Sequence, residues 1–264
     1  MRWLGAALPA RAQLAGALLA SVGFQGARAP GAELGPQSAV PLFPSAQGQL
    51  DYARELKLSR RSLPADQREG RGLLAASAYR AVALRFPHEV ALAQEALFRS
   101  GQLLIAMGRE EEALRDFFYV ANAGSAWSQR ARMELGHVQR RHGHWERAWS
   151  HYFHVANAPQ GALEVRASAQ LLSGDMFLCM GRINAAKTAW RSAVNSSHDS
   201  RKRVLAFDRL ARMEIEFGTT LRLAELLLEC LQRLDDVVLE DSEQGRRARR
   251  ALEQSRLVKA LARA

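Results

Sequence analysis

The sequence has little of what disulfide-stabilised domains, β proteins and common enzymes depend on. Its 264 residues include only two cysteines, too few for a disulfide scaffold and without the spacing of a metal site. Strand-like alternation of Val, Ile and Thr is absent, as are a glycine-rich phosphate loop, a nucleophile elbow and a paired-carboxylate motif. Ala, Leu, Arg and Glu, which favour helices, dominate instead. We therefore expect an all-α protein.

The two cysteines, Cys179 and Cys230, leave two interpretations open. A single disulfide bond between them would form only in an oxidising compartment. We favour the second interpretation, in which both are small buried residues of helices, because free cysteine commonly packs as an apolar side chain.

The amino-terminal residues differ in composition from the rest of the chain. Arg2 and Arg11 accompany an apolar run at residues 14–24, which is too short to span a bilayer as a helix, and no acidic residue precedes Glu33. This layout is typical of a secretory signal peptide, here residues 1–29, and predicts a secreted or periplasmic protein. A mitochondrial transit peptide and an uncleaved membrane-proximal anchor are the alternatives.

The next part of the chain is predicted to change from a tether to helices. Residues 30–48 contain four prolines with Gly and Ser, and we expect them to form no helix and to bury no core. Residues 49–61 can form a first helix. Pro64 suits the first position of a second helix that ends at Phe86, before another proline.

A repeated pattern organises the middle of the chain. Three glycines, Gly108, Gly143 and Gly181, are each predicted to form the bend of a helical hairpin. Each has a second glycine seven residues before it, an alanine five residues after it and an aromatic residue nine residues after it. In chain order these are Gly101, Ala113 and Phe117; Gly136, Ala148 and Tyr152; and Gly174, Ala186 and Trp190.

Weaker copies flank the three clear ones. A leading copy has Gly70 in the place of the bend glycine, with Ala75 and Tyr79 at the usual offsets. A trailing copy centres on Gly218, with Ala211 as its earlier small residue, and its alanine follows the bend by six residues instead of five. We expect this last hairpin to be locally distorted.

Over residues 65–240 the pattern resembles the tetratricopeptide repeat family. The resemblance implies a right-handed α-solenoid, here an array over residues 49–240, in which the small residues let helices approach closely and the aromatic residues fill the space between successive pairs. Residues 241–264 would form a capping helix on the array. Tyr79, with the Phe86-Pro87 step and the small residues after it, is similar to periplasmic members associated with outer-membrane assembly and envelope constriction.

In such arrays the first helices of the hairpins line a concave groove. The resemblance and helical spacing together predict the groove residues Phe98, Gln102, Met133, His137, Arg140, Leu171, Asp175, Asp208 and Arg212. Family members that bind chaperone tails hold a terminal carboxylate with Lys and Asn, but this chain has Phe98 and Gln102 there, so that activity does not carry over. We expect a non-catalytic scaffold that binds protein partners in the groove, without cofactor or metal.

The net charge of +10 gives an alternative function. The arginine-rich run at residues 246–250 resembles a patch for nucleic acid, glycan or lipid, so the chain could be an adaptor for anionic polymers. Its helix also has apolar residues at helical spacing, which suits a cap. Arg130, Arg140, Arg209 and Arg212 would favour an anionic peptide, or are solvated surface residues.

Two further clusters have an ordinary interpretation and a functional one. Five of the seven histidines lie between His137 and His154, but no HExxH spacing and no carboxylate at a suitable offset accompany them, so we expect exposed helix residues and not a metal site. Trp149 is next to a repeat alanine. We expect it to face outward or toward the next repeat, as a candidate binding residue.

Overall fold

The computed structural model describes residues 40–159, 162–197 and 199–238, together with residues 246, 250 and 253. The predicted signal peptide, the first part of the predicted tether and most of the predicted capping segment lie outside these residues. Within them every regular element is a helix, so the all-α prediction is confirmed.

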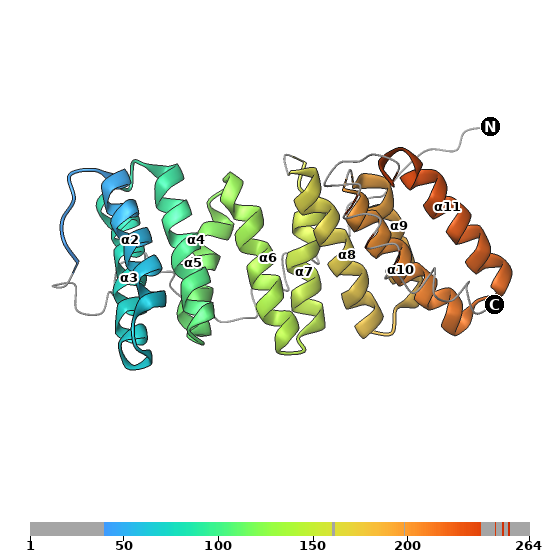
Figure 1. Ribbon diagram of the computed structural model, residues 1–264, viewed down its shortest axis with the longest axis horizontal. Coiled ribbons are helices and arrows are strands. Elements are labelled where there is room, and N and C mark those ends of the chain that lie inside the picture. Colours follow the sequence, from blue (N-terminus) through green and yellow to red (C-terminus); the bar gives the residue numbers. More distant parts are fainter. Residues whose placement is uncertain are drawn as a thin grey trace, which may run out of the picture.

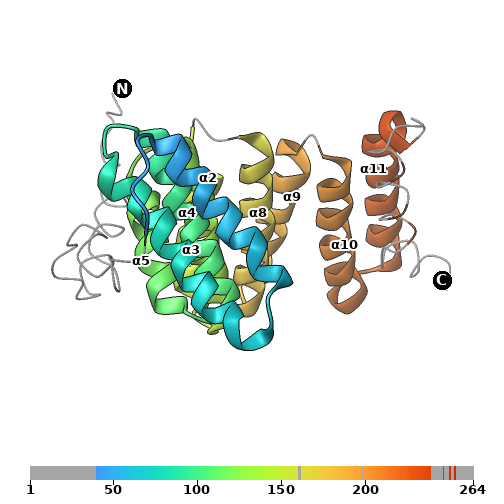
Figure 2. The same ribbon diagram turned by 60° about the vertical axis from the view of Figure 1, so that its left-hand side comes forward.

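The helices pack side by side in chain order. They form a row from α2 to α11 (Figure 1), which Figure 2 shows with its α2 end turned forward. The elements are α2 (Ala46–Ser59), the short 3₁₀ helix η2 (Arg60–Ser62), α3 (Ala65–Arg85), α4 (Val90–Ala106), α5 (Glu110–Asn122), α6 (Ala126–Arg141), α7 (Trp145–Ala156), α8 (Leu163–Cys179), α9 (Ile183–Ser196), α10 (Ser200–Phe217) and α11 (Thr220–Val238).

The array begins earlier than the sequence pattern indicated. Helix α2 starts at Ala46, because the Ser45 hydroxyl accepts a backbone N–H of its first turn at 3.1 Å. Val40 and Ala46 are buried in the core, and Arg85 of α3 donates to the Pro41 carbonyl at 2.9 Å. The expectation for residues 30–48 is therefore wrong in two respects: residues 46–48 are helical, and Val40 and Ala46 are part of the core.

The bends of the three clear hairpins share one backbone conformation. Gly108, Gly143 and Gly181 have φ values of +78°, +73° and +71°, a left-handed region that glycine enters without steric cost. In each bend the N–H after the glycine donates to the carbonyl five residues earlier, at 2.9, 3.0 and 2.8 Å respectively. These bonds end the first helix in a Schellman-type cap. The prediction of three bend glycines is confirmed.

The other glycine of each clear copy lies under the aromatic ring of the same hairpin. The pairs are Gly101–Phe117, Gly136–Tyr152 and Gly174–Trp190. A Cβ at Gly136 would lie 2.5 Å from Tyr152 Cε1, so only glycine lets the second helix place its ring there. The three rings are fully buried. They pack within one hairpin, onto its first helix, and this detail refines the prediction that they fill the space between pairs.

The leading copy departs from the pattern. Gly70 lies inside α3, where a Cβ would meet no atom within 4 Å, and η2 forms the bend between α2 and α3. Gly70 has the offsets of a bend glycine but lies inside the helix predicted from Pro64 to Phe86. Ala75 and Tyr79 are buried as predicted. The close approach is at Gly72, where a Cβ would lie 2.5 Å from Met107 Sδ.

The last hairpin is distorted, as predicted. Gly218 has φ −111° and ψ −155°, an extended conformation, and not the left-handed conformation of the other bends. Ala211 is fully buried in α10. Leu223, five residues after the bend, is also buried, at the position where the clear copies have alanine. A larger side chain at this contact accompanies the different bend.

Candidate functional site

The first helices of successive hairpins form a continuous layer. Helix α2 contacts α4, α4 contacts α6, α6 contacts α8, and α8 contacts α10. The second helices pack mainly against the first helices before and after them. All predicted groove residues belong to α4, α6, α8 and α10, so they lie on the helices of this layer.

An open hollow of about 380 Å³ lies on the layer of first helices. Four first helices, α4, α6, α8 and α10, contribute residues to its lining. These residues are Phe98, Arg99, Gln102, Arg130, Met133, Glu134, Glu164, Val165, Ser168 and Lys202. Three of the predicted groove residues, Phe98, Gln102 and Met133, are among them. The hollow therefore includes part of the predicted groove.

The other predicted groove residues are not in the lining of the hollow: His137, Arg140, Leu171, Asp175, Asp208 and Arg212. Leu171 is buried in the core, so the expectation that it faces a ligand is wrong. It belongs to a core cluster that includes Trp190 of α9 and Phe207 of α10.

Two predicted groove residues position the buried rings. The His137 Nδ1 lies 2.9 Å from the Tyr152 hydroxyl, and burial lowers the pKa of His137 below its ordinary value. The Trp190 Nε1 donates to Asp175 Oδ1 and to the Leu171 carbonyl, both at 3.2 Å. Because a buried polar atom without a partner is costly, these two side chains have a structural task that helical spacing alone did not reveal.

Aromatic rings and arginines form the α4–α6 end of the hollow. Phe98 is buried, with its ring centroid 5.1 Å from that of Trp127 and 5.7 Å from that of Phe117. The guanidinium carbons of Arg99 and Arg130 lie 5.5 and 4.9 Å from the centre of the Trp127 ring. At these distances the indole attracts both cations.

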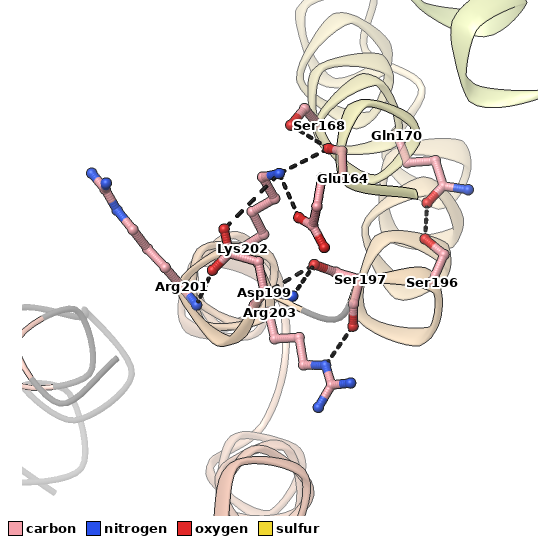
Figure 3. Close-up of polar contacts among 9 residues, drawn as sticks. All are labelled: Glu164, Ser168, Gln170, Ser196, Ser197, Asp199, Arg201, Lys202 and Arg203. Atoms are coloured by element: carbon pink, nitrogen blue, oxygen red, sulfur yellow. Dashed lines mark hydrogen bonds and ion pairs between the residues drawn. The ribbon is translucent and has the colours of Figure 1, made fainter. Parts of the chain in front are cut away.

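A lysine from α10 lines the hollow at its α8–α10 end, and Figure 3 shows the polar contacts of this lysine. Lys202 Nζ donates to the carboxylate of Glu164 at 2.6 Å and to its carbonyl at 2.8 Å. Asp199 caps α10 by accepting the Arg201 N–H at 2.9 Å, and the Asp199 N–H donates to Ser197 Oγ at 3.1 Å. The α9–α10 turn thus directs Lys202 toward the first turn of α8.

Sequence reasoning missed most of the polar residues of the hollow. Glu134 is four residues after Arg130 and one after Met133, so helical spacing on α6 could have found it. Lys202 could not have been found in this way. It reaches the hollow through the geometry of the α9–α10 turn, which the repeat pattern does not encode.

Three of the four arginines proposed for an anionic peptide differ in their partners, and the fourth, Arg140, lies on α6 outside the lining of the hollow. Arg209 forms a two-bond ion pair with Asp175 at 2.5 and 2.9 Å, and Arg212 pairs with Glu216 at 3.0 Å. Arg130 alone of the four lines the hollow. Its guanidinium lies on Trp127, and no carboxylate of the described residues pairs with it within 4 Å.

The histidine cluster does not form one site. His142 Nε2 lies 2.5 Å from a Glu110 oxygen, and His144 Nδ1 lies 2.9 Å from Gln139 Oε1. Burial, together with Arg132, lowers the pKa of His151 to about 4. In the described part of the chain no group of three or more His, Cys, Asp or Glu side chains is placed to hold a metal ion.

Trp149 and the cysteines have different surroundings from one another. Trp149 faces the next hairpin, as one predicted alternative had it. The centre of its ring lies 5.1 Å from that of Phe153 and 5.4 Å from that of Phe177.

Both cysteines are free thiols. Cys230 is buried, but Cys179 is exposed at the end of α8, so the prediction of two buried cysteines is wrong for Cys179.

Comparison with known proteins adds no relative. No protein-family model matches the chain, and no curated protein matches it in sequence. Among the described residues, no helix combines the length and apolar character needed to cross a bilayer.

Proposed function

We propose that this chain is a non-catalytic scaffold that binds partner peptides or domains along its layer of first helices. Under this proposal the array is a right-handed solenoid of tetratricopeptide-like hairpins, and its partners are proteins. The observation that carries the proposal is the open hollow spanning α4, α6, α8 and α10. A site built from four successive hairpins suits an extended peptide, which can contact each helix in turn.

The chemistry of the hollow supports a peptide as its occupant. Met133 and Val165 offer apolar surface beside the largely buried ring of Phe98, while Gln102 and Glu134 offer hydrogen-bonding groups. A peptide carries both kinds of group at short intervals. Enzymatic chemistry would favour a deep site that excludes water, and this hollow is open.

The test is to fill the hollow from one of its walls. Ser168 of α8 lines it and donates to the Glu164 carbonyl at 2.8 Å. Ser168→Trp should abolish recovery of partners from host lysate by the tagged chain. Thr188→Trp is the matched control, because Thr188 makes the same bond to the Asn184 carbonyl, at 3.0 Å, and is exposed on a second helix.

Equal recovery of every partner by the two tryptophan variants would overturn the proposal. The triple change of Met133, His137 and Arg140 to Ala tests the longer predicted groove. It also removes the His137–Tyr152 bond, so circular dichroism must first show that the variant is folded.

The alternative function, an adaptor for anionic polymers, predicts a different result. Changing Arg246, Arg247, Arg249 and Arg250 to Gln would then abolish binding, and affinity for duplex DNA or anionic vesicles would fall steeply with salt as counterions are released. A peptide scaffold keeps its partners in this variant. Arg246 and Arg250 are exposed, which also suits a role in solubility.

We also propose that the protein is secreted or periplasmic, with mitochondrial import as the alternative. The basic start, the apolar run and the small residues after it support this localisation. Sequencing the amino terminus of the native protein should give a start between Pro30 and Glu33. An intact Met1 on cytosolic protein would contradict the proposal.

A further inference from the structure

We propose that the hollow selects acidic peptides, with Arg130 binding a carboxylate of the peptide and Phe98, Met133 and Val165 contacting a neighbouring apolar side chain. This inference rests on the proposed function and names the chemistry of the partner. It depends on which charges of the hollow are already paired and which are not.

Most of the charges in the hollow have partners within the protein. Lys202 is paired with Glu164 at 2.6 Å. Arg99 lies 3.6 Å from Glu95 and also donates to Gln102 Oε1 at 3.4 Å. The Lys202–Glu164 pair joins α10 to α8, and the two contacts of Arg99 lie within α4. These charges are already partly neutralised, so they contribute less to the choice of ligand than an unpaired one.

Arg130 is the cation that remains available. Glu134 follows it by four residues, the spacing at which Arg and Glu commonly pair on a helix, yet the Arg130 guanidinium lies over the Trp127 ring, 4.9 Å from its centre. Stacking holds the plane of a guanidinium and leaves its N–H donors at the edge for an acceptor. A carboxylate fits these paired N–H donors best, because its two oxygens can accept from both of them.

Glu134 is the carboxylate that could favour a basic ligand instead. It already accepts a hydrogen bond from the Gln102 amide at 3.3 Å. The lining holds three cations, Arg99, Arg130 and Lys202, against the two carboxylates Glu134 and Glu164. Lys202 is paired with Glu164, and Arg99 lies beside Glu95 outside the lining. Arg130 and the already hydrogen-bonded Glu134 are therefore the charges left for a ligand, and in a chain of net charge +10 an acidic peptide is favoured over a basic one.

The apolar part of the hollow determines what accompanies the acidic residue. Met133 is partly buried and follows Arg130 by three residues on the same face of α6. Val165 of α8 and the buried ring of Phe98 on α4 complete this surface. An acidic residue next to an apolar one is the peptide pattern that satisfies both parts.

The experiment is a selection of random dodecapeptides on phage against the full chain, followed by sequencing of the bound pool. Four variants are selected in parallel: Arg130→Gln, Glu134→Gln, Ser168→Trp and Arg147→Gln. Arg147 is an exposed arginine of α7, a second helix, and serves as the matched control for Arg130. Peptides enriched by the native chain and lost with Ser168→Trp are those that use the hollow.

We expect the hollow-dependent peptides to be enriched in Asp or Glu beside an apolar residue. Arg130→Gln should remove the acidic preference and weaken a selected acidic peptide about tenfold, the loss expected for one charge-assisted hydrogen bond. Arg147→Gln and Glu134→Gln should keep the acidic preference. Fluorescence anisotropy with that peptide should also show weaker binding as salt is raised.

Two results would count against the inference in distinguishable ways. Hollow-dependent peptides without an acidic preference, or with one that Arg130→Gln leaves intact, would overturn the role of Arg130 and leave the scaffold function standing. A basic preference that Glu134→Gln removes would have the same effect. If no peptide depends on the hollow, the proposed function itself fails.

Discussion

The α4–α5 and α6–α7 hairpins have the same framework but opposite polar chemistry at one position. Each has a bend glycine of positive φ and a buried ring on a glycine of its first helix. The residue before the ring is Asp116 in the first hairpin and His151 in the second. Asp116 is buried against a cation, Arg80, whereas His151 is a half-buried base beside the cation Arg132.

The difference teaches which contacts the repeat requires and which it leaves free. Arg80 donates from Nε to both oxygens of Asp116, at 3.0 and 3.1 Å, and so links α3 to α5. One repeat later, the residue in the place of Arg80 is Phe118, which has no charge to offer His151. Glycine and ring positions are thus common to the hairpins, while the polar residue before the ring and its surroundings differ from one hairpin to the next.

The largest effect should come from removing the cation of the buried pair. Asp116 is fully buried, and Arg80→Gln would leave its carboxylate without a charged partner. Breaking a buried pair in this way costs about 3–5 kcal/mol. Burial already raises the pKa of Asp116, which shows how little solvent stabilises this carboxylate. Urea denaturation followed by circular dichroism measures the loss.

Arg209→Gln is the matched control for the buried pair. Arg209 also holds an aspartate with two bonds, but the side chains of Arg209 and Asp175 are 29% and 23% exposed. A pair this accessible to water is worth about 1 kcal/mol or less. Equal losses in the two variants would mean that burial does not distinguish these ion pairs.

The glycines and rings of the hairpins could be predicted from the sequence because few residue types can replace them at these positions. A left-handed bend favours glycine, and a ring against a helix backbone needs glycine opposite it, so both leave a periodic signal. Gly70 shows the limit of that signal. It has the right offsets from Ala75 and Tyr79, but it lies on an exposed helix surface where any residue would fit.

The second effect is on pH dependence and concerns His151. Its pKa is about 4 in the folded protein against an ordinary value of 6.5, so the unfolded chain binds a proton in this range and the folded chain does not. The free energy of unfolding should therefore fall as pH is lowered from about 6.5 to about 4, by no more than about 3 kcal/mol. Above pH 7 His151 is neutral in both the folded and the unfolded chain, so it no longer lowers the free energy of unfolding.

The contribution of His151 is isolated by comparing the native chain with His151→Gln. Carboxylates titrate in the same range in both proteins, so the difference between the two stability curves belongs to His151. His154 is more exposed and also has a lowered pKa, and it stays present in both. Parallel curves between pH 7 and pH 4 would show that His151 titrates normally in the folded state.

The candidate site was less predictable than the fold, and the reason is physical. Helical spacing says which residues share a face, but the depth of a side chain depends on the neighbouring helices. Leu171 and Phe98 are on first helices and are nevertheless buried. The polar side chains of His137 and Asp175 are hydrogen-bonded to the buried residues Tyr152 and Trp190.

The smallest effect, and the one that tests what the two hairpins share, concerns the glycines under the rings. Gly101→Leu and Gly136→Leu should each lower the free energy of unfolding by about 1–3 kcal/mol, because a side chain would displace Phe117 or Tyr152. Gly70→Leu is the control. No atom lies within 4 Å of its Cβ position, so this change should stabilise the chain by up to about 1 kcal/mol through helix propensity. Urea midpoints compare the three. An unchanged or raised midpoint for Gly136→Leu would show that the ring does not need the glycine, and a loss at only one of Gly101 and Gly136 would show that the two hairpins do not depend on this contact alike.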